Sequence, residues 1–177
     1  VYANVNWQDE MFRNTGAQQH SILITGGGKN SNMSVSSNYT DQKGTLIGSG
    51  FKKGGFRFTS DLTKNWLKLG QSISYTKRDG SSFNSVGYGQ MYDVISAIPH
   101  VQIYNPNNDG GYGGYINDMP EGIRANPVAR ALLPNTDFSN EYLSVNGNAE
   151  VTFTKNLKYK FNLGFQSDNL YNFNFTP

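Results

Sequence analysis

The chain has 177 residues, of which 36% are hydrophobic, 14% aromatic and 16% charged, and its formal net charge is +2. So small a charge argues against a nucleic-acid partner, and the aromatic content argues against disorder. The absence of cysteine excludes a disulfide framework and a thiolate zinc site. No apolar run approaches the ~18–20 residues of a membrane-spanning helix, so a helical membrane protein is also excluded.

The dominant pattern is an alternation of apolar and polar residues with a period of two, which is typical of strands with one apolar face. It begins in VYANVNWQDEM (residues 1–11), which we interpret as a strand because Val1, Ala3, Val5 and Trp7 would share one face. Further strands are predicted at Gln18–Gly26, Met33–Tyr39, Phe56–Leu62, Trp66–Tyr75, Glu141–Phe153 and Leu157–Phe165. Several of these seven strands exceed the ~5–6 residues of a usual globular strand.

The connections between the predicted strands fall into two kinds that alternate along the chain. Short turns are expected at 26–32, 63–65 and 154–156, and longer connections at 41–50 and 79–140. An up-and-down meander would place every short turn at one end of the sheet and every long connection at the other. Outer-membrane barrels have this asymmetry, with short periplasmic turns and long extracellular loops.

The long connection contains two predicted helices. YGQMYDVISAIP (88–99) has apolar residues at helical spacing and ends at Pro99, and NPVARALL (126–133) has Pro127 at a favourable first helical position. The fold class we expect is therefore all-β. It is a segment of an antiparallel up-and-down transmembrane β-barrel, with about seven strands and one long extracellular loop, 79–140, that contains helices. A closed bacterial barrel needs an even number of at least eight strands, and so we interpret residues 1–177 as part of a larger barrel domain.

The alternation assigns side chains to two faces of this barrel. The polar face would line the lumen, where charged residues contact plug or cargo or only form ion pairs with one another: Arg57, Asp61, Lys68, Glu150, Lys158 and Lys160. Apolar residues beside two short turns would form a girdle at the headgroups, although a sandwich core is an alternative: Trp66, Phe153, Leu157 and Tyr159. Tyrosines crowd the long loop and would contact cargo or a partner, or pin the loop to itself: Tyr88, Tyr92, Tyr104, Tyr112 and Tyr115.

No catalytic site, metal site or cofactor site is predicted. The two histidines, His20 and His100, are far apart in the sequence and have no carboxylate at ligand spacing. NPNNDG (105–110) resembles the start of a calcium loop, but Ile116 stands where the bidentate glutamate is needed. We therefore expect a simple Asn/Gly turn there.

The same segments resemble a known family. NWQDEMFRNTGAQQHSILITGG is similar to the segment that follows the plug domain in SusC/RagA-like TonB-dependent outer-membrane transporters of Bacteroidota. DQKG, GSGFK and WLKLG, followed later by NPVA and LKYKFNLGF, resemble further blocks of that family. The resemblance implies a 22-stranded barrel in the bacterial outer membrane, a plug energised through TonB, a SusD-like surface lipoprotein and a glycan or peptide cargo. The TonB box and the plug are absent from this sequence.

Two competing functions remain open at this point. A soluble β-sandwich that binds carbohydrate would bury the apolar faces against each other, but it would leave the one-sided loops unexplained. An enzyme on a smaller outer-membrane barrel would need a catalytic constellation in the outer loops, and none is evident. We therefore expect a part of a transporter rather than an enzyme.

Overall fold

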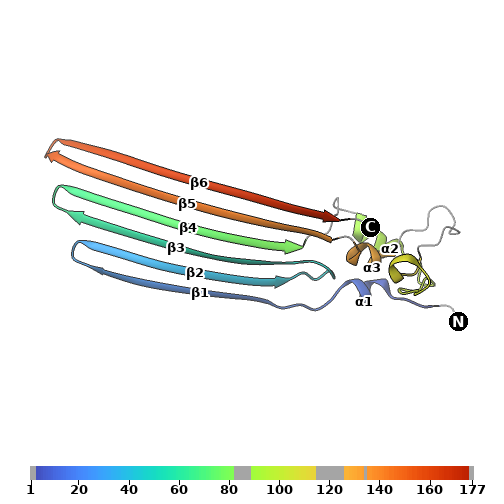
Figure 1. The fold of residues 1–177 in the computed structure, drawn as a ribbon. Coiled ribbons are helices and arrows are strands. Elements are labelled where there is room, and N and C mark those ends of the chain that lie inside the picture. Colours follow the sequence, from blue (N-terminus) through green and yellow to red (C-terminus); the bar gives the residue numbers. More distant parts are fainter. Residues whose placement is uncertain (1–2, 82–88, 115–125, 134, 176–177) are drawn as a thin grey trace.

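In the computed structural model, residues 3–81, 89–114, 126–133 and 135–175 are described. Their strands form one antiparallel sheet in chain order, β1-β2-β3-β4-β5-β6 (Figure 1). The bounds are β1 (Ala17–Gly28), β2 (Ser31–Lys43), β3 (Gly50–Lys64), β4 (Leu67–Ser81), β5 (Asn135–Thr154) and β6 (Leu157–Phe175). The predicted all-β, up-and-down fold class is confirmed.

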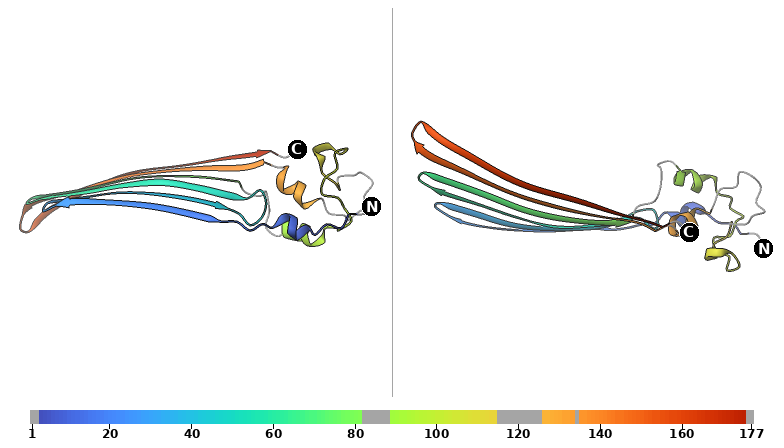
Figure 2. Two further views of the ribbon diagram at one scale, coloured as in Figure 1. Left: turned by 90° about the horizontal axis from the view of Figure 1, so that it is seen from below. Right: turned by 45° about the horizontal axis from the view of Figure 1, so that its top comes forward.

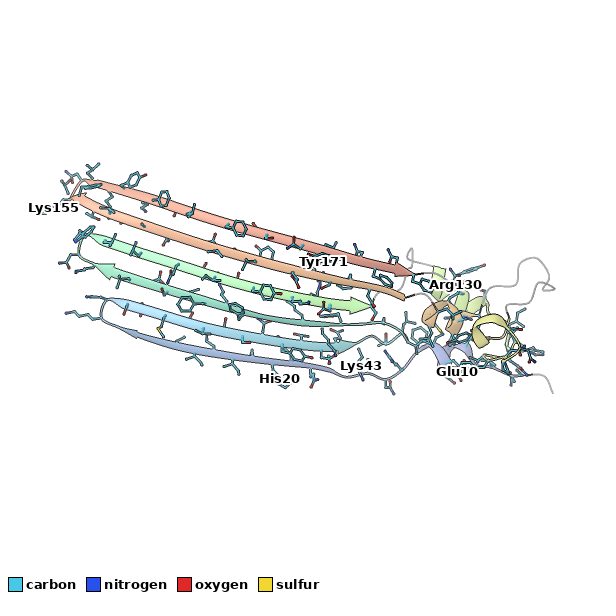
Figure 3. All side chains as sticks on the ribbon, in the orientation of Figure 1. Glu10, His20, Lys43, Arg130, Lys155 and Tyr171 are labelled. Atoms are coloured by element: carbon cyan, nitrogen blue, oxygen red, sulfur yellow. The ribbon has the colours of Figure 1, made fainter. Side chains whose placement is uncertain are left out.

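The two kinds of connection lie at opposite ends of the sheet, as predicted. Turns at Lys29–Asn30, Asn65–Trp66 and Lys155–Asn156 join three hairpins at one end, which we call the turn end. Residues 44–49 connect β2 to β3, and the connection from β4 to β5 lies at the same opposite end, which we call the loop end. Figure 3 labels Lys155 at the turn end and Lys43 near the loop end.

The described helices gather at the loop end, and we call them, with the loops between them, the cap. They are α1 (Trp7–Met11), α2 (Gly89–Ser96), the short 3-10 helix η1 (Asp109–Gly111) and α3 (Pro127–Leu132). The helices expected near 88–99 and from Pro127 onward are confirmed by α2 and α3. Within the described residues, no helix is long and apolar enough to cross a membrane.

The strand predicted at residues 1–11 is wrong, because the described part of this segment contains α1 and no strand, which leaves six strands in place of seven. Asn6 caps the helix by accepting a hydrogen bond from the Gln8 N–H (3.2 Å). Trp7 and Met11, four residues apart, lie on one face of the helix and are both buried. The helical spacing of these two large side chains therefore prevailed over the period-two pattern.

The only hydrophobic core within the described residues is in the cap. Its buried side chains are Trp7, Met11, Val94, Val128 and Ala131, and Leu46 and Ile47 from the β2–β3 connection pack against them. The views in Figure 2 show a long, gently curved sheet one layer thick, with the cap at one end. Neither face of the described sheet is covered by a second layer.

Candidate functional surfaces

The register places apolar side chains of neighbouring strands side by side on one face, which we call the apolar face. One row across all six strands is entirely apolar: Ile24, Val35, Phe58, Ile73, Val145 and Phe165. Large side chains on this face are exposed, Ile24 at 63% and Leu163 at 66%, for example. In water so extensive an apolar surface would be expected to associate with another molecule.

The apolar face changes character toward the loop end. Two rows beyond Ile73 on β4 lies Lys77, and its register partner on β5 is Glu141. The Lys77 Nζ lies 3.1 Å from Glu141 Oε1. On β4 and β5 the apolar stretch is therefore bounded by an ion pair well before the strands end, whereas β6 carries Tyr171, Phe173 and Phe175 on this face farther toward the loop end.

The four residues predicted to form a girdle do lie together at the turn end. Trp66, Phe153, Leu157 and Tyr159 are 54–63% exposed. The Thr152 N–H donates to the Trp66 carbonyl (2.7 Å), which ties the β3–β4 turn to β5. Their role as a membrane girdle stays a prediction.

The opposite face, which we call the polar face, carries paired charges near the turn end. Lys68, Glu150 and Lys160 are consecutive register partners on β4, β5 and β6. Glu150 lies 3.4 Å from the Lys158 Nζ and 3.2 Å from the Lys160 Nζ. Of the six charged residues predicted for this face, the structure thus brings four together.

The remaining two predicted residues lie farther along the same face. Asp61 lines a hollow of about 500 Å³ together with Asn146, Asn148 and Asn162. Its carboxylate and the Asn148 amide converge over Gly70, where an added Cβ would lie 2.9 Å and 2.2 Å from their Oδ1 atoms. Arg57 is placed between Ser36 and Ser74.

Two further cations of the polar face, near the loop end, were missed in the sequence. Lys53 and Arg78 are direct register partners on β3 and β4. The Arg78 guanidinium lies 5.4 Å from the centroid of the Phe138 ring, within cation–π range. Alternation alone places Lys53 on the same face as Arg57, but only the register brings Arg78 beside it.

The predicted tyrosines have different positions in the cap. Tyr92 on α2 is 54% exposed and Tyr104 61% exposed. The rings of Tyr104 and Tyr112 are 5.5 Å apart between centroids. Burial, and secondarily Tyr104, raises the pKa of Tyr112 above its ordinary value. Tyr88 and Tyr115 lie outside the described residues.

Polar contacts hold the cap together. The Trp7 indole N–H donates to the Ile98 carbonyl (3.0 Å), and the Val5 N–H donates to the Pro99 carbonyl (2.8 Å). Arg130, labelled in Figure 3, forms an ion pair with the buried carboxylate of Asp93. The first two contacts join the first residues of the chain to the β4–β5 connection, and the ion pair joins α2 to α3 within that connection.

Asn126 is the polar centre of the cap and is 2% exposed. Its Oδ1 accepts from the N–H groups of Val128 (3.0 Å) and Ala129 (3.2 Å), and so caps α3. Its Nδ2 donates to the carbonyls of Ile103 (2.9 Å) and Gly113 (3.0 Å). All four hydrogen bonds stay inside the chain, which makes Asn126 structural.

The described residues contain no cluster of three or more side chains suited to a metal ion. The segment predicted as an Asn/Gly turn closes on itself. The Asn107 N–H donates to Asn105 Oδ1 (3.1 Å), and the Asn108 amide donates to the Tyr112 carbonyl (2.9 Å).

A single sheet with one apolar and one polar face, short turns at one end and large loops at the other, is the structure of part of a β-barrel wall. The chain is 31% identical over 178 residues to TonB-dependent receptor P3 of Formosa agariphila, an alignment that covers 94% of this chain. It is 40% identical over 60 residues, 34% of this chain, to TonB-dependent receptor SusC of Bacteroides thetaiotaomicron. The chain spans 17% and 6% of the lengths of these two relatives.

Solved structures show the same fold. The RagAB peptide importer in its closed-closed state superposes with a TM-score of 0.71 at 22% sequence identity. The match covers 96% of this chain and 19% of the importer chain. The open-open state matches with the same score. No family model matches the chain. The resemblance of this chain to SusC/RagA-like TonB-dependent receptors is therefore confirmed.

Proposed function

We propose that this chain forms part of the barrel wall of a TonB-dependent transporter in the bacterial outer membrane, which imports glycans or peptides with a SusD-like surface lipoprotein. The observation that carries the proposal is the uncovered apolar face of a one-layer sheet. A sandwich would cover that face with a second sheet, and the described residues contain only one. In a barrel wall, outer-membrane lipid covers it instead.

The height of the apolar stretch fits a membrane. From Leu67 to Tyr75 on β4 the face carries Leu67, Leu69, Ile73 and Tyr75, together with Gln71, whose amide donates to Ser60 Oγ on β3 (3.0 Å), before Lys77. At ~3.3 Å per residue this is roughly 26 Å along the strand, or roughly 20 Å along the normal at a tilt of about 40°. The apolar band of outer-membrane barrels is about 25 Å tall. The Lys77–Glu141 ion pair then lies near the outer headgroups, and the strands continue beyond them to the cap.

This orientation gives each surface a role. The turn end faces the periplasm, with Trp66 and its three neighbours at the inner headgroups. The polar face lines the lumen, where Arg57 and Asp61 contact plug or cargo, whereas the charges around Glu150 form ion pairs with one another. The connection predicted at 79–140 is extracellular, and its exposed Tyr92 and Tyr104 contact cargo or the lipoprotein. Residues 1–177 are one portion of the barrel domain, and TonB acts through a plug that these residues do not include.

Cysteine labelling tests the orientation directly, because these 177 residues contain no cysteine. The Glu10→Cys variant places a thiol on the exposed surface of the cap, and the Lys155→Cys variant places one at the turn end (Figure 3). In intact cells, a membrane-impermeant maleimide should label Glu10→Cys, and should label Lys155→Cys only after the outer membrane is permeabilised. The unsubstituted protein is the control for any cysteine elsewhere. Equal labelling of both variants in intact cells would refute the orientation.

Transport requires a second test. Deletion of the gene should abolish growth on one class of oligosaccharide or peptide, and deletion of TonB should do the same. Growth of the gene deletion on every such nutrient at the parental rate would count against an import function. Rescue by a plasmid copy controls for effects on neighbouring genes.

A further inference from the structure

The polar face carries three cations that we call the basic cluster: Lys53 and Arg78 near the loop end, and Arg57 two rows closer to the middle of the sheet. Lys53 and Arg78 are directly opposite each other, an arrangement of like charges that destabilises a sheet. Within the described residues none of the three forms an ion pair. This contrasts with the turn end of the same face, where one glutamate serves two lysines. Since no carboxylate of the described sheet pairs with these cations, the arrangement is suited to an anion from outside the sheet.

The neighbours of the basic cluster on the polar face are rich in hydroxyl and amide groups. Thr40 and Asn140 flank the Lys53–Arg78 pair, and Ser36 and Ser74 flank Arg57. The row between them contains Asn38, Gly55, Thr76 and Tyr142. Apart from Asp168, whose Oδ1 accepts from the Asn140 amide (2.6 Å), no carboxylate lies in these three rows.

One end of the basic cluster is built around an aromatic ring. The Phe138 ring lies over Gly80, where an added Cβ would come within 2.6 Å of two ring carbons. Arg78 lies against the same ring, so the ring limits where the guanidinium can move. Phe51 lies in the same row as Gly80 and Phe138. A positioned guanidinium loses less side-chain entropy when it binds an anion, and it can bind a carboxylate with two parallel hydrogen bonds.

We propose that the basic cluster binds an acidic oligosaccharide, through carboxylate or sulfate groups on its sugars, as the cargo enters the barrel. This proposal rests on the proposed transport function and assigns its cargo class. Hydroxyl and amide side chains both donate and accept hydrogen bonds, as sugar hydroxyls do. An acidic peptide would satisfy the cations equally well, but its apolar side chains would find only Leu23 and Leu170, at the two edges of these rows, and the row of Phe51 and Phe138. The lining therefore favours the sugar.

The test uses the full-length protein that contains this chain, purified in detergent. The acidic probes are oligogalacturonate and a sulfated carrageenan oligosaccharide, each compared with a neutral counterpart, fully methyl-esterified or desulfated. An oligoglutamate peptide is the competitor of the other class. Calorimetry should show that at least one acidic oligosaccharide binds and that its neutral counterpart binds at least about tenfold more weakly.

Matched variants locate the site. The double variant Lys53→Gln/Arg78→Gln should weaken binding of the acidic sugar by about tenfold or more. Lys158→Gln/Lys160→Gln removes the same charge from the turn end and should change binding by less than about twofold. Heat-dependent mobility in gel electrophoresis verifies that each barrel is folded. The Arg78→Lys variant, which keeps the charge, should bind the acidic sugar more tightly than the double glutamine variant.

Several outcomes would overturn the proposal. These are equal losses in both double variants, no preference for acidic over neutral sugars, or tighter binding of oligoglutamate than of any sugar. Unchanged binding with a lowered melting temperature in Lys53→Gln/Arg78→Gln would show that the basic cluster instead contacts another part of the same polypeptide. Binding in detergent needs neither TonB nor a membrane, so these outcomes are independent of the labelling and growth tests.

Discussion

The cap and the sheet are stabilised in different ways, although they belong to one chain. Every buried side chain of the described residues lies in the cap: Trp7, Met11, Asp93, Val94, Asn126, Pro127, Val128, Ala129 and Ala131. The sheet has no buried side chain, although its strands are longer than the helices of the cap and its apolar residues are more numerous than those of the cap. The cap thus has the interior of a small water-soluble unit, whereas the sheet has two surfaces and no interior.

The difference shows which solvent each region requires. The backbone groups inside the sheet are paired along five ladders, with one register shift between Thr152 and Thr154 at the turn end, and such pairing is a condition for crossing a bilayer. Its side chains gain stability only if lipid replaces water on the apolar face. The cap excludes water from its own core and needs no lipid. Substitutions chosen by region should therefore respond differently to the membrane.

The largest effect is expected from Trp7→Ala in the cap core. Removal of a buried aromatic side chain costs about 3–5 kcal/mol, and here the hydrogen bond to the Ile98 carbonyl is lost as well. Hydrogen exchange of α2 and α3 should accelerate while the exchange of β3 and β4 stays unchanged. Gln8→Ala, on the exposed side of the same helix, is the control. Acceleration throughout the sheet would show that the two regions are one cooperative unit.

A smaller effect is expected from Ile73→Arg, in the middle row of the apolar face. A cationic side chain at the bilayer midplane costs about 2–4 kcal/mol in an outer-membrane barrel. The adjacent Ser72 lies on the polar face, so Ser72→Arg is the matched control and should cost much less. The free energy of unfolding of the full-length protein, measured by denaturant titration in lipid vesicles, gives both values. Equal losses would contradict the assignment of the two faces.

The next largest effect is expected from Asn126→Ala. It should lower the free energy of unfolding by roughly 2–3 kcal/mol, because α3 loses its cap and two buried carbonyls lose their donor. Asn126→Ser keeps a side-chain acceptor for the N–H groups at the start of α3 without burying a charge, but it loses both amide hydrogen bonds to the Ile103 and Gly113 carbonyls. Its stability should fall between that of the alanine variant and that of the native chain. Hydrogen exchange of α3 measures both. Identical losses would mean that only the donated bonds stabilise the cap.

Much of the sheet could be predicted from the sequence because a strand exposed to different surroundings on its two faces must alternate. The alternating segments from Leu67 to Tyr75 and from Leu157 to Phe165 indicate which side chains share a face. The lengths of the connections indicate at which end of the sheet each connection lies. α1 was mistaken for a strand because Val5 and Trp7 fit a period of two, and only the partners of Trp7 and Met11, distant in the sequence, favour a helix.

The polar face was predicted less completely, since it depends on register. Alternation shows that Lys68 and Glu150 share a face, but not that they are partners. The opposition of Lys53 and Arg78 depends on the position of the β3–β4 turn to within one residue. The packing of Leu46, Val94 and Val128 into one core was likewise beyond local patterns, because it joins the β2–β3 connection to two helices of the β4–β5 connection.

The smallest effect on stability is expected at the turn end of the polar face. Two substitutions there distinguish a charge that keeps an ion-pair partner from charges that lose theirs. Lys158→Gln should leave the free energy of unfolding unchanged within error, because Lys160 still pairs with Glu150 and both lysines are exposed. Glu150→Gln should lower it measurably, because Lys158 and Lys160 then lose their ion-pair partner and Lys68 its neighbouring carboxylate. That loss should shrink in roughly 1 M salt, where exposed charges are screened within about 3 Å. A loss for Glu150→Gln that is independent of salt would mean that hydrogen bonding, and not charge, couples these strands. The native repulsion between Lys53 and Arg78 would then destabilise the sheet less than their register suggests.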